Sequence, residues 1–525
     1  MFFKKYKFLL LLTVLLVGAC GGGGSEGSTS NDTNLPTNTN QDNAPNNPPA
    51  NPSIPGNLLV VDPGTGNDDN TYAQVSGGTH QWATPERALW GSIDRNTPNA
   101  SEAAQPGDVI RLADGIYVGQ GIQNDVSGQS PRNLAAFTPF NSGTENNPIV
   151  LEAANPRGAT LQANPNNHVN AVVSNFWDGP GSGRSYFNVR GLVIDWSANE
   201  DRSNTFGPGE FAAVKLLGGQ HNTIENCDII GRFDTQVNRG TNWAAIFLQN
   251  NQYTTIRNNH IRNQGYNGDG AAIEWYSAPD SLVEYNTISN VDSGFLIKTD
   301  QRGMDHKNII VRYNYVKDVK KKSIMITRHI GSATEPTLIY QNVFANVGAS
   351  GGMGILDLAQ YGTTAYIRII NNSFYAPLIA ANINASGQYN YHNLNNFIFM
   401  NNILASAGNA LINAGGTGGS GNPSDYWISN YNCYQKINGG FKYSFHGADY
   451  NSLATWRALG EDANSVDADP LYVNPGNGDL TLQTSSPCLN LGRDLLGLLG
   501  SDTNALINGG AYIKADQSDA IGANW

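Results

Sequence analysis

One pattern of apolar and polar positions recurs along the middle of the chain. It consists of an apolar residue, two further residues, an asparagine, one residue and another apolar residue, as in VEYNTI and VRYNYV. The asparagines of its clearest copies are 27, 28, 28, 30 and 30 residues apart; they are Asn259, Asn286, Asn314, Asn342, Asn372 and Asn402. Weaker copies place Cys227 and Leu192 at this position. A period of this length predicts stacked units, each burying its apolar face against its neighbours.

Within each unit, apolar and polar residues alternate over short runs such as AAIEWYS and GFLIKTD, broken by Asn, Gly, Asp and Ser. Alternation over four to six residues predicts strands, and no unit has room for two amphipathic helices. We expect the asparagines of successive units to stack, with each amide bonded to the next at about 4.8 Å.

The repeats resemble those of the right-handed parallel β-helix in the pectate-lyase-like superfamily, over roughly residues 58 to 490. The resemblance implies an all-β solenoid with an N-terminal helical cap and a C-terminal closing coil. A β-propeller or β-sandwich is the alternative, although a propeller blade has a longer period of about 40 residues.

Residues 1–20 contain Lys4, Lys5 and Lys7, then an apolar run from Phe8 to Ala19, then Cys20. The run is too short to span a bilayer and predicts an export signal. Its ending resembles the bacterial lipobox, which implies cleavage before Cys20 and lipidation of that thiol. An ordinary secretory signal is the alternative. Gly21 follows the cysteine, and resemblance to Gram-negative lipoproteins then implies the outer membrane, at the cell surface or the periplasmic face.

Residues 21–56 are rich in Asn, Gly, Pro and Ser and almost devoid of apolar residues. Such a segment cannot bury a core, so we expect a disordered tether. A single β-helix domain then covers residues 57–525, with the cap at 57–120, the coils at about 121–445 and the closing region at 446–525. Thr84 followed by Pro85 predicts a helix start in the cap.

The net charge of −12 argues against nucleic acid as a partner. Nine of the 31 Lys and Arg residues nevertheless fall between residues 298 and 328, and such a belt can focus an anionic ligand. The triplet Lys320 to Lys322 could instead sit on a solvated turn. We expect an acidic polysaccharide as substrate, a membrane contact through the lipid anchor only, and a monomer.

Beyond Cys20 the chain has Cys227, Cys433 and Cys488, with no spacing typical of a zinc site. Cys433 and Cys488 could form a disulfide. Cys227 occupies an asparagine position and is expected in the core.

Alternation within the strands also predicts a row of outward polar side chains on equivalent positions of successive coils. Such a row would suit an extended sugar chain. Its members are Lys215, Gln249, Glu274, Lys298, Arg328 and Asp357. A shift of register by one residue brings in Tyr276, Asp300 and His329, and turns at the edge carry Asp234, Asn267, Asp269 and Arg302.

This row could carry out eliminative cleavage of a uronic-acid polymer, which needs a neutralised carboxylate, a base and an acid. The pairing of Lys298 with upstream acids resembles the β-helix polysaccharide lyases that act on pectate, alginate or chondroitin. In this interpretation Lys298 and Arg328 are catalytic, and Asp234, Asp269 and Glu274 bind Ca²⁺. The substrate contacts are Lys215, Gln249, Tyr276, Arg302, His329 and Asp357. The clustered aspartates of pectate lyases are absent from the sequence.

Two other functions remain open. A glycoside hydrolase on the same fold would use Glu274 and Asp357 as its two carboxylates. A non-catalytic carbohydrate-binding surface protein would need only the groove, and the fold alone does not distinguish the three.

Overall fold

The protein is described by a computed structural model. The chain divides into two units, Met1–Pro52 and Ser53–Trp525, and every residue that the structure describes belongs to the second. The described residues are 56–119, 135–165, 169–176, 183–197, 211–234, 243–266, 270–298, 307–327, 329, 331–348, 356–358, 364–377, 383–384, 394–407, 411–414, 427–445, 448–493, 506–507 and 510. The expected export signal with Cys20 and the tether up to residue 55 lie outside this set. Among the described residues, none of the helices has the length and apolar character needed to cross a membrane.

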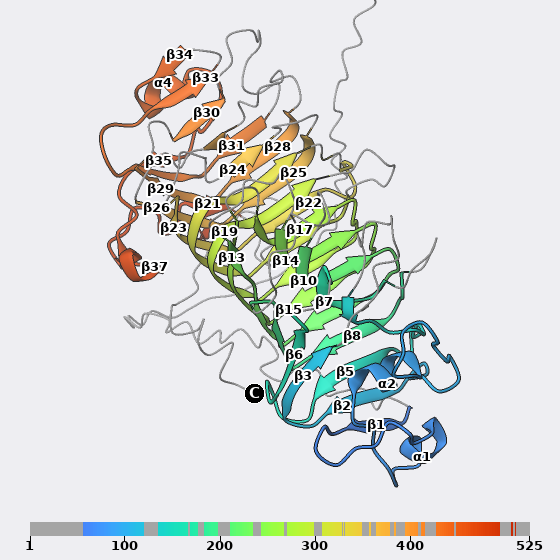
Figure 1. The fold of residues 1–525 in the computed structure, drawn as a ribbon. Helices are drawn as coiled ribbons and strands as arrows, with labels where there is room; N and C mark the ends of the chain where they lie inside the picture. Colours follow the sequence, from blue (N-terminus) through green and yellow to red (C-terminus); the bar gives the residue numbers. More distant parts are fainter. Residues whose placement is uncertain are drawn as a thin grey trace, which may run out of the picture. The chain divides into compact units, whose positions relative to one another are not determined.

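Parallel strands stack coil upon coil and form three walls (Figure 1). The first wall is a sheet of twelve strands in which every neighbouring pair is parallel. Its members are β1 (Leu58–Val61), β2 (Val109–Leu112), β5 (Ile149–Ala153), β8 (Phe187–Arg190), β11 (Thr223–Glu225), β15 (Thr255–Arg257), β18 (Leu282–Glu284), β20 (Ile310–Arg312), β22 (Thr337–Tyr340), β25 (Thr364–Ile370), β28 (Leu394–Met400) and β31 (Trp427–Asn430).

The second wall follows the first along the chain in each coil. Its strands are β3 (Gly115–Gly119), β6 (Ala159–Ala163), β9 (Val193–Asp195), β12 (Asp228–Ile230), β16 (His260–Tyr266), the first halves of β19 (Thr287–Lys298) and β21 (Tyr315–Thr327), β23 (Val343–Val347), β26 (Ser373–Ala376), β29 (Ile403–Ser406), β32 (Cys433–Lys436) and β35 (Val466–Asp467). The short β13 (Phe233–Asp234) pairs with the end of β16.

The third wall carries the candidate site. It consists of β4 (Ala135–Phe137), β7 (Ala171–Ser174), β10 (Phe211–Leu217), β14 (Trp243–Gln249), β17 (Ala271–Tyr276), the second halves of β19 and β21, β24 (Leu356–Leu358), β27 (Ile383–Asn384), β30 (Ile412–Ala414) and β33 (Tyr443–Phe445). Because β19 and β21 run through both walls, the two walls form one continuous sheet.

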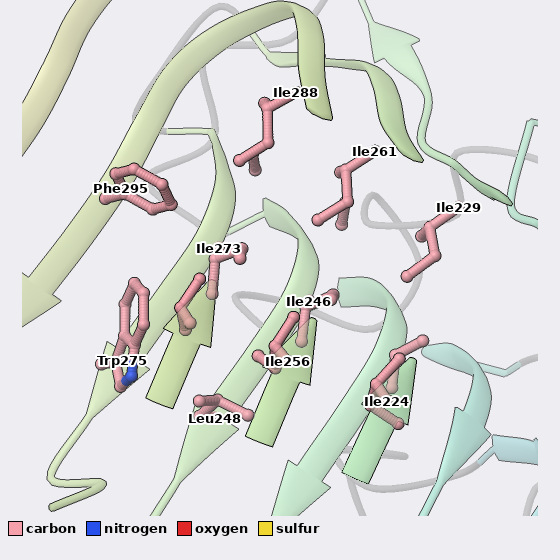
Figure 2. Packing of buried hydrophobic residues seen from close by; sticks show 14 of the residues in the cluster. Ile224, Ile229, Ile246, Leu248, Ile256, Ile261, Ile273, Trp275, Ile288 and Phe295 are labelled. Atoms are coloured by element: carbon pink, nitrogen blue, oxygen red, sulfur yellow. The ribbon is translucent and has the colours of Figure 1, made fainter. Parts of the chain in front are cut away.

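Stacked apolar side chains fill the space between the walls. Ile224 and Ile256 come from the first wall, Ile229 and Ile261 from the second, and Trp275 from the third (Figure 2). All five are fully buried, and each isoleucine pair occupies equivalent positions of adjacent strands. Trp275, which alternates with Glu274 along the strand, thus lies inside.

The predicted asparagine ladder is confirmed. The Nδ2 group of each ladder residue from Asn259 to Asn372 donates to Oδ1 of the next, at 2.9–3.1 Å. The backbone N–H of Cys227 donates to Oδ1 of Asn259 at the start of the ladder, as its place in the repeat indicated. Asn432 extends the ladder beyond the six copies recognised in the sequence, and its backbone N–H donates to Ser465 Oγ.

Each ladder asparagine follows a residue with positive φ, for example Tyr285 at 55° and Tyr313 at 55°. This left-handed conformation turns the chain from the first wall into the second. The side chains of Tyr285 and Tyr313 stack on each other outside the corner, with ring centroids 5.0 Å apart. The ladder therefore stabilises a backbone conformation that a non-glycine residue adopts at a cost.

The helix expected after Thr84 is present. Helix α2 (Pro85–Trp90) starts at Thr84, whose hydroxyl accepts from the Arg87 N–H, and all its residues are buried. A second helix, α1 (Tyr72–Ser76), precedes it, and α4 (Leu453–Arg457) lies in the closing region.

The closing region ends in two small antiparallel sheets. One is the hairpin of β36 (Tyr472–Asn474), a 3₁₀ turn η3 (Pro475–Asn477) and β37 (Asp479–Leu482); the other pairs β38 (Gly492–Arg493) with β39 (Leu506–Ile507). The strand β34 (Ala448–Tyr450) pairs antiparallel with β33. The hairpin packs on the outside of the second wall, where Leu480 joins Tyr315 and Val343 in an apolar cluster. A disulfide joins Cys433 of this wall to Cys488, as the sequence had suggested, while Cys227 is a buried free thiol.

Candidate functional site

Two columns of outward side chains run along the third wall, two residues apart on each strand. The first, the Glu274 column, follows the strand register through Lys215, Phe247, Glu274, Leu296 and Met325, and the backbone of Asp357 continues this register. The second, the Lys298 column, contains Leu217, Gln249, Tyr276, Lys298 and Thr327. Both columns point away from the core because Ile273, Trp275 and their equivalents point inward.

The single row expected from the sequence is therefore wrong in its register. Gln249 and Lys298 stand in one column, whereas Lys215, Glu274 and Asp357 belong to the other. The residue paired with Lys298 on β21 is Thr327 and not Arg328. The equivalent positions could not be identified from polarity alone, because Phe247, Leu296 and Met325 are apolar and yet face outward.

Glu274 and Lys298 form the centre of the site. The carboxylate of Glu274 is fully buried, and its Oε1 lies 3.3 Å from Nζ of Lys298, whose side chain is 18% exposed. The same Nζ lies 4.2 Å from the ring centroid of Tyr276, the residue directly beside Lys298 on β17. A carboxylate and an aromatic face thus both contact one partly exposed amine.

Apolar residues surround this centre. Phe247 and Leu296, the register neighbours of Glu274 on either side, are both buried. Lys215, two coils before Glu274, is 1% exposed, and its Nζ lies 5.6 Å from the Phe247 ring centroid. The outward face of the third wall is consequently a low-dielectric setting in which charges interact strongly.

The basic triplet Lys320 to Lys322 lies within β21, so the alternative of a solvated turn is wrong. Lys322 is buried and its Nζ lies 3.3 Å from Met325 Sδ. Lys321 pairs with Asp292 at 3.2 Å. Neither Asp292 nor Phe247 was predicted as part of the site; the signal that could have identified Asp292 is its place one coil before the triplet.

His329 lies apart from both columns. Its ring is buried, and Nε2 lies 2.9 Å from the Thr337 hydroxyl on the first wall. Burial lowers the pKa of His329 to about 3, so the imidazole is neutral at physiological pH. A side chain without exposed surface does not contact a sugar outside the coil, and the structure gives no support to this part of the substrate site.

Several predicted residues fall outside the described part of the chain: Arg328, Arg302, Asp269, Asn267 and Asp300. Asp234 and Asp357 lie in β13 and β24, but the structure describes only their backbone.

The described residues contain no group of three or more His, Cys, Asp or Glu side chains that could hold a metal ion. Of the three predicted calcium ligands, only the side chain of Glu274 is described, and an ammonium contacts it at 3.3 Å. A cation so close opposes Ca²⁺ at the same oxygen. Glu274 therefore does not fit a calcium site.

The carboxylate pair expected for a hydrolase is widely spaced along the wall. Leu296 and Met325 separate Glu274 from Asp357 in their column, which puts the two backbones three rungs, or roughly 14 Å, apart. Paired carboxyl groups of glycosidases lie about 5–9.5 Å apart. The side chains would have to lean toward each other across two apolar residues to reach that range.

The architecture and the family comparison define a right-handed parallel β-helix. Residues 183–374 match the model of the right handed beta helix region, which confirms the fold expected from the repeats. The resemblance to the pectate-lyase-like superfamily is confirmed at the level of this fold.

Similar solved structures include pectate lyase Pel9A, with a TM-score of 0.47, 15% sequence identity and coverage of 87% of this chain and 96% of that chain. A rhamnogalacturonan lyase has a TM-score of 0.41 at 14% identity, over 89% of this chain and 98% of that one. A GH136 lacto-N-biosidase from Eubacterium ramulus has a TM-score of 0.40 at 12% identity, over 79% and 67%. These likenesses concern the fold alone. No curated protein matches the sequence.

Proposed function

We propose that the protein is a polysaccharide lyase that cleaves an acidic, uronate-containing polymer by β-elimination. The observation that carries this proposal is Lys298, a partly exposed amine on the outward face of the third wall, held between a buried carboxylate and an aromatic ring. An amine positioned on such a face suits proton removal from a bound sugar.

In the proposed step, the Lys298 ammonium passes a proton to the Glu274 carboxylate beside it, and the resulting amine takes the proton from the carbon next to the uronate carboxyl group. The electrons of that C–H bond form a carbon–carbon double bond, and the glycosidic C–O bond on the neighbouring carbon breaks. The departing oxygen receives a proton from an acid, and we assign this role to the hydroxyl of Tyr276, whose ring the amine contacts. Arg328 would pair with the uronate carboxylate and so stabilise the charge that develops beside it.

The test is an assay of the purified protein on pectate, alginate and glycosaminoglycans. A lyase produces an unsaturated sugar with new ultraviolet absorbance at the cleaved end. Reducing ends without this absorbance would instead identify a hydrolase, and binding without cleavage would identify a carbohydrate-binding protein. Either of these results would overturn the proposal.

We also propose that Asp234 and Asp269 bind Ca²⁺, without a contribution from Glu274. If Ca²⁺ neutralises the uronate carboxylate, chelation should abolish cleavage and added Ca²⁺ should restore it. Cleavage that continues in the presence of a chelator would leave this role to Arg328.

Attachment to the outer membrane through Cys20 is likewise proposed from the sequence. We expect Cys20→Ser to abolish incorporation of labelled palmitate and to release the protein from the membrane fraction. Unchanged fractionation of this variant would contradict the proposed anchor.

A further inference from the structure

We infer that Glu274 is a positioning residue for Lys298, and that Glu274 and the ring of Tyr276 together form a clamp that holds the amine over β17. The inference rests on the proposed function in assigning the reaction to Lys298. The clamp consists of two contacts of the Lys298 amine, one with Glu274 and one with the Tyr276 ring, and it can be tested without any substrate.

The Glu274 carboxylate lies in apolar surroundings. It is fully buried on a strand whose neighbours place Phe247 and Leu296 on either side. A carboxylate in such surroundings is costly unless a cation compensates it, and Lys298 supplies a cation at 3.3 Å. The buried Glu274 carboxylate therefore holds the Lys298 amine in place more firmly than a solvated surface carboxylate would.

The Lys298 side chain points toward the preceding coil. Its backbone lies on β19, one rung beyond β17 and two residues further along the strand than the partner of Glu274. The Nζ contacts both Glu274 and the Tyr276 ring, and both residues belong to β17. The amine therefore leans back across the wall toward the preceding coil.

Two consequences follow for the reaction. The sugar that loses its proton lies over β17, beside Tyr276, and not between Lys298 and the next coil. Glu274 acts through Lys298 without touching the substrate. This role differs from that of a calcium ligand and from that of the acid in a hydrolase.

The experiment measures how fast Lys298 is acetylated by acetic anhydride in the full-length folded protein, by mass spectrometry of the peptide that contains it. Because an amine held by a carboxylate reacts slowly, we expect Glu274→Gln to accelerate acetylation of Lys298 roughly fivefold. Glu274→Asp retains the charge one methylene further away and should give an intermediate rate. Acetylation of Lys317, on the second wall, serves as the internal standard in every sample.

The ring is tested by a matched pair of variants. Tyr276→Phe retains the aromatic face and should leave the acetylation rate unchanged, whereas Tyr276→Leu removes it and should raise the rate. Glu284→Gln is the control for loss of a buried glutamate, since Glu284 pairs with Arg312 on the first wall. Thermal melts establish that each variant is folded.

The outcomes separate the clamp from the proposed function. An unchanged rate for Lys298 in folded Glu274→Gln overturns the clamp, whatever the activity of the protein. An accelerated rate in a protein that cleaves none of the polymers upholds the clamp and overturns the lyase assignment. If both hold, Glu274→Gln should lower kcat with little change in KM, and Glu274→Asp should restore part of it.

Discussion

Nδ2 of Asn286 donates a hydrogen bond to Oδ1 of Asn314 at 2.9 Å, and the backbone N–H of Asn286 donates to the same oxygen at 3.0 Å. Nδ2 of Asn314 in turn donates to Oδ1 of Asn342 and to the backbone carbonyl of Val283. Both asparagines are fully buried. One side chain thus satisfies polar groups on the coils before and after its own, with no access to water.

Asn314→Ala should therefore destabilise the protein by about 3 kcal/mol, because it leaves several buried donors and acceptors without partners. Urea unfolding followed by circular dichroism measures this loss. The control is Asn464→Ala, which removes an exposed asparagine side chain from the closing region and should change stability by less than about 0.5 kcal/mol. Equal effects of the two substitutions would show that the ladder contributes nothing to stability.

Lys298→Ala should reduce the proposed lyase activity at least about 100-fold, because the reaction loses its base. It should also lower the unfolding temperature, because the buried Glu274 loses the cation that lies 3.3 Å from it, so activity is compared at a temperature where the variant is folded. Formation of the unsaturated product measures the effect. Lys317→Ala is the matched control, since Lys317 lies on β21 where that strand belongs to the second wall. Activity that survives in Lys298→Ala would refute the site assignment even if the protein proved to be a lyase.

The stability of the closing region should depend on pH through Glu461. Burial, as the main cause, and the neighbouring Asp462 raise the pKa of Glu461 from 4.5 to about 7, while the Ser429 N–H that donates to it acts in the opposite direction. The folded state therefore binds this proton more tightly than the unfolded chain does. Its contribution is present in full below pH 4.5 and is lost as the pH rises through about 7.

Glu461→Gln should accordingly be more stable than the parent protein at pH 8, by up to about 3 kcal/mol, and nearly equal to it at pH 4. Thermal unfolding over this pH range provides the measurement. Glu145→Gln, at an exposed position, is expected to show no such trend. A difference for Glu461→Gln that stays flat from pH 4 to 8 would contradict the argument.

Reduction of the Cys433–Cys488 disulfide should loosen the closing region. The bond spans 55 residues and joins the second wall to the segment after the β36–β37 hairpin. Its loss should cost about 2–4 kcal/mol. We expect dithiothreitol to lower the unfolding temperature of the parent protein and to leave that of a Cys433→Ala/Cys488→Ala variant unchanged. A parent protein whose melt is unaffected after thiol titration confirms full reduction would rule out this role.

The ladder shows why so much of the fold could be predicted. An asparagine that must meet its equivalent on the next coil leaves a strict period in the chain, and apolar alternation then defines the inward residues. Cys227 was located in the ladder by the same rule. Asn432 was missed although it follows Asn402 by the same 30 residues, because Ser429 stands where the recognised copies have an apolar residue three positions before the asparagine.

The candidate site was predicted less well. The sequence identified Glu274 and Lys298 as outward residues of neighbouring strands, and the structure places them in contact. It did not assign them to separate columns, because the outward face contains Phe247, Leu296 and Met325, which look like core residues in the sequence. His329 was predicted as a substrate contact only for a shifted register, and polarity alone does not reveal that Thr337 supplies it with a buried partner.

From Asn259 to Asn372, each ladder asparagine donates to the coil after it and accepts from the coil before it, so these coils carry the same connector in the same orientation. After duplication or deletion of an entire coil, each amide donor would still meet an amide acceptor on the next coil. Substitution of a single ladder asparagine instead leaves a donor on one neighbouring coil and an acceptor on the other without their partner. We therefore expect relatives of this protein to vary in the number of coils far more freely than in the residue at the connector.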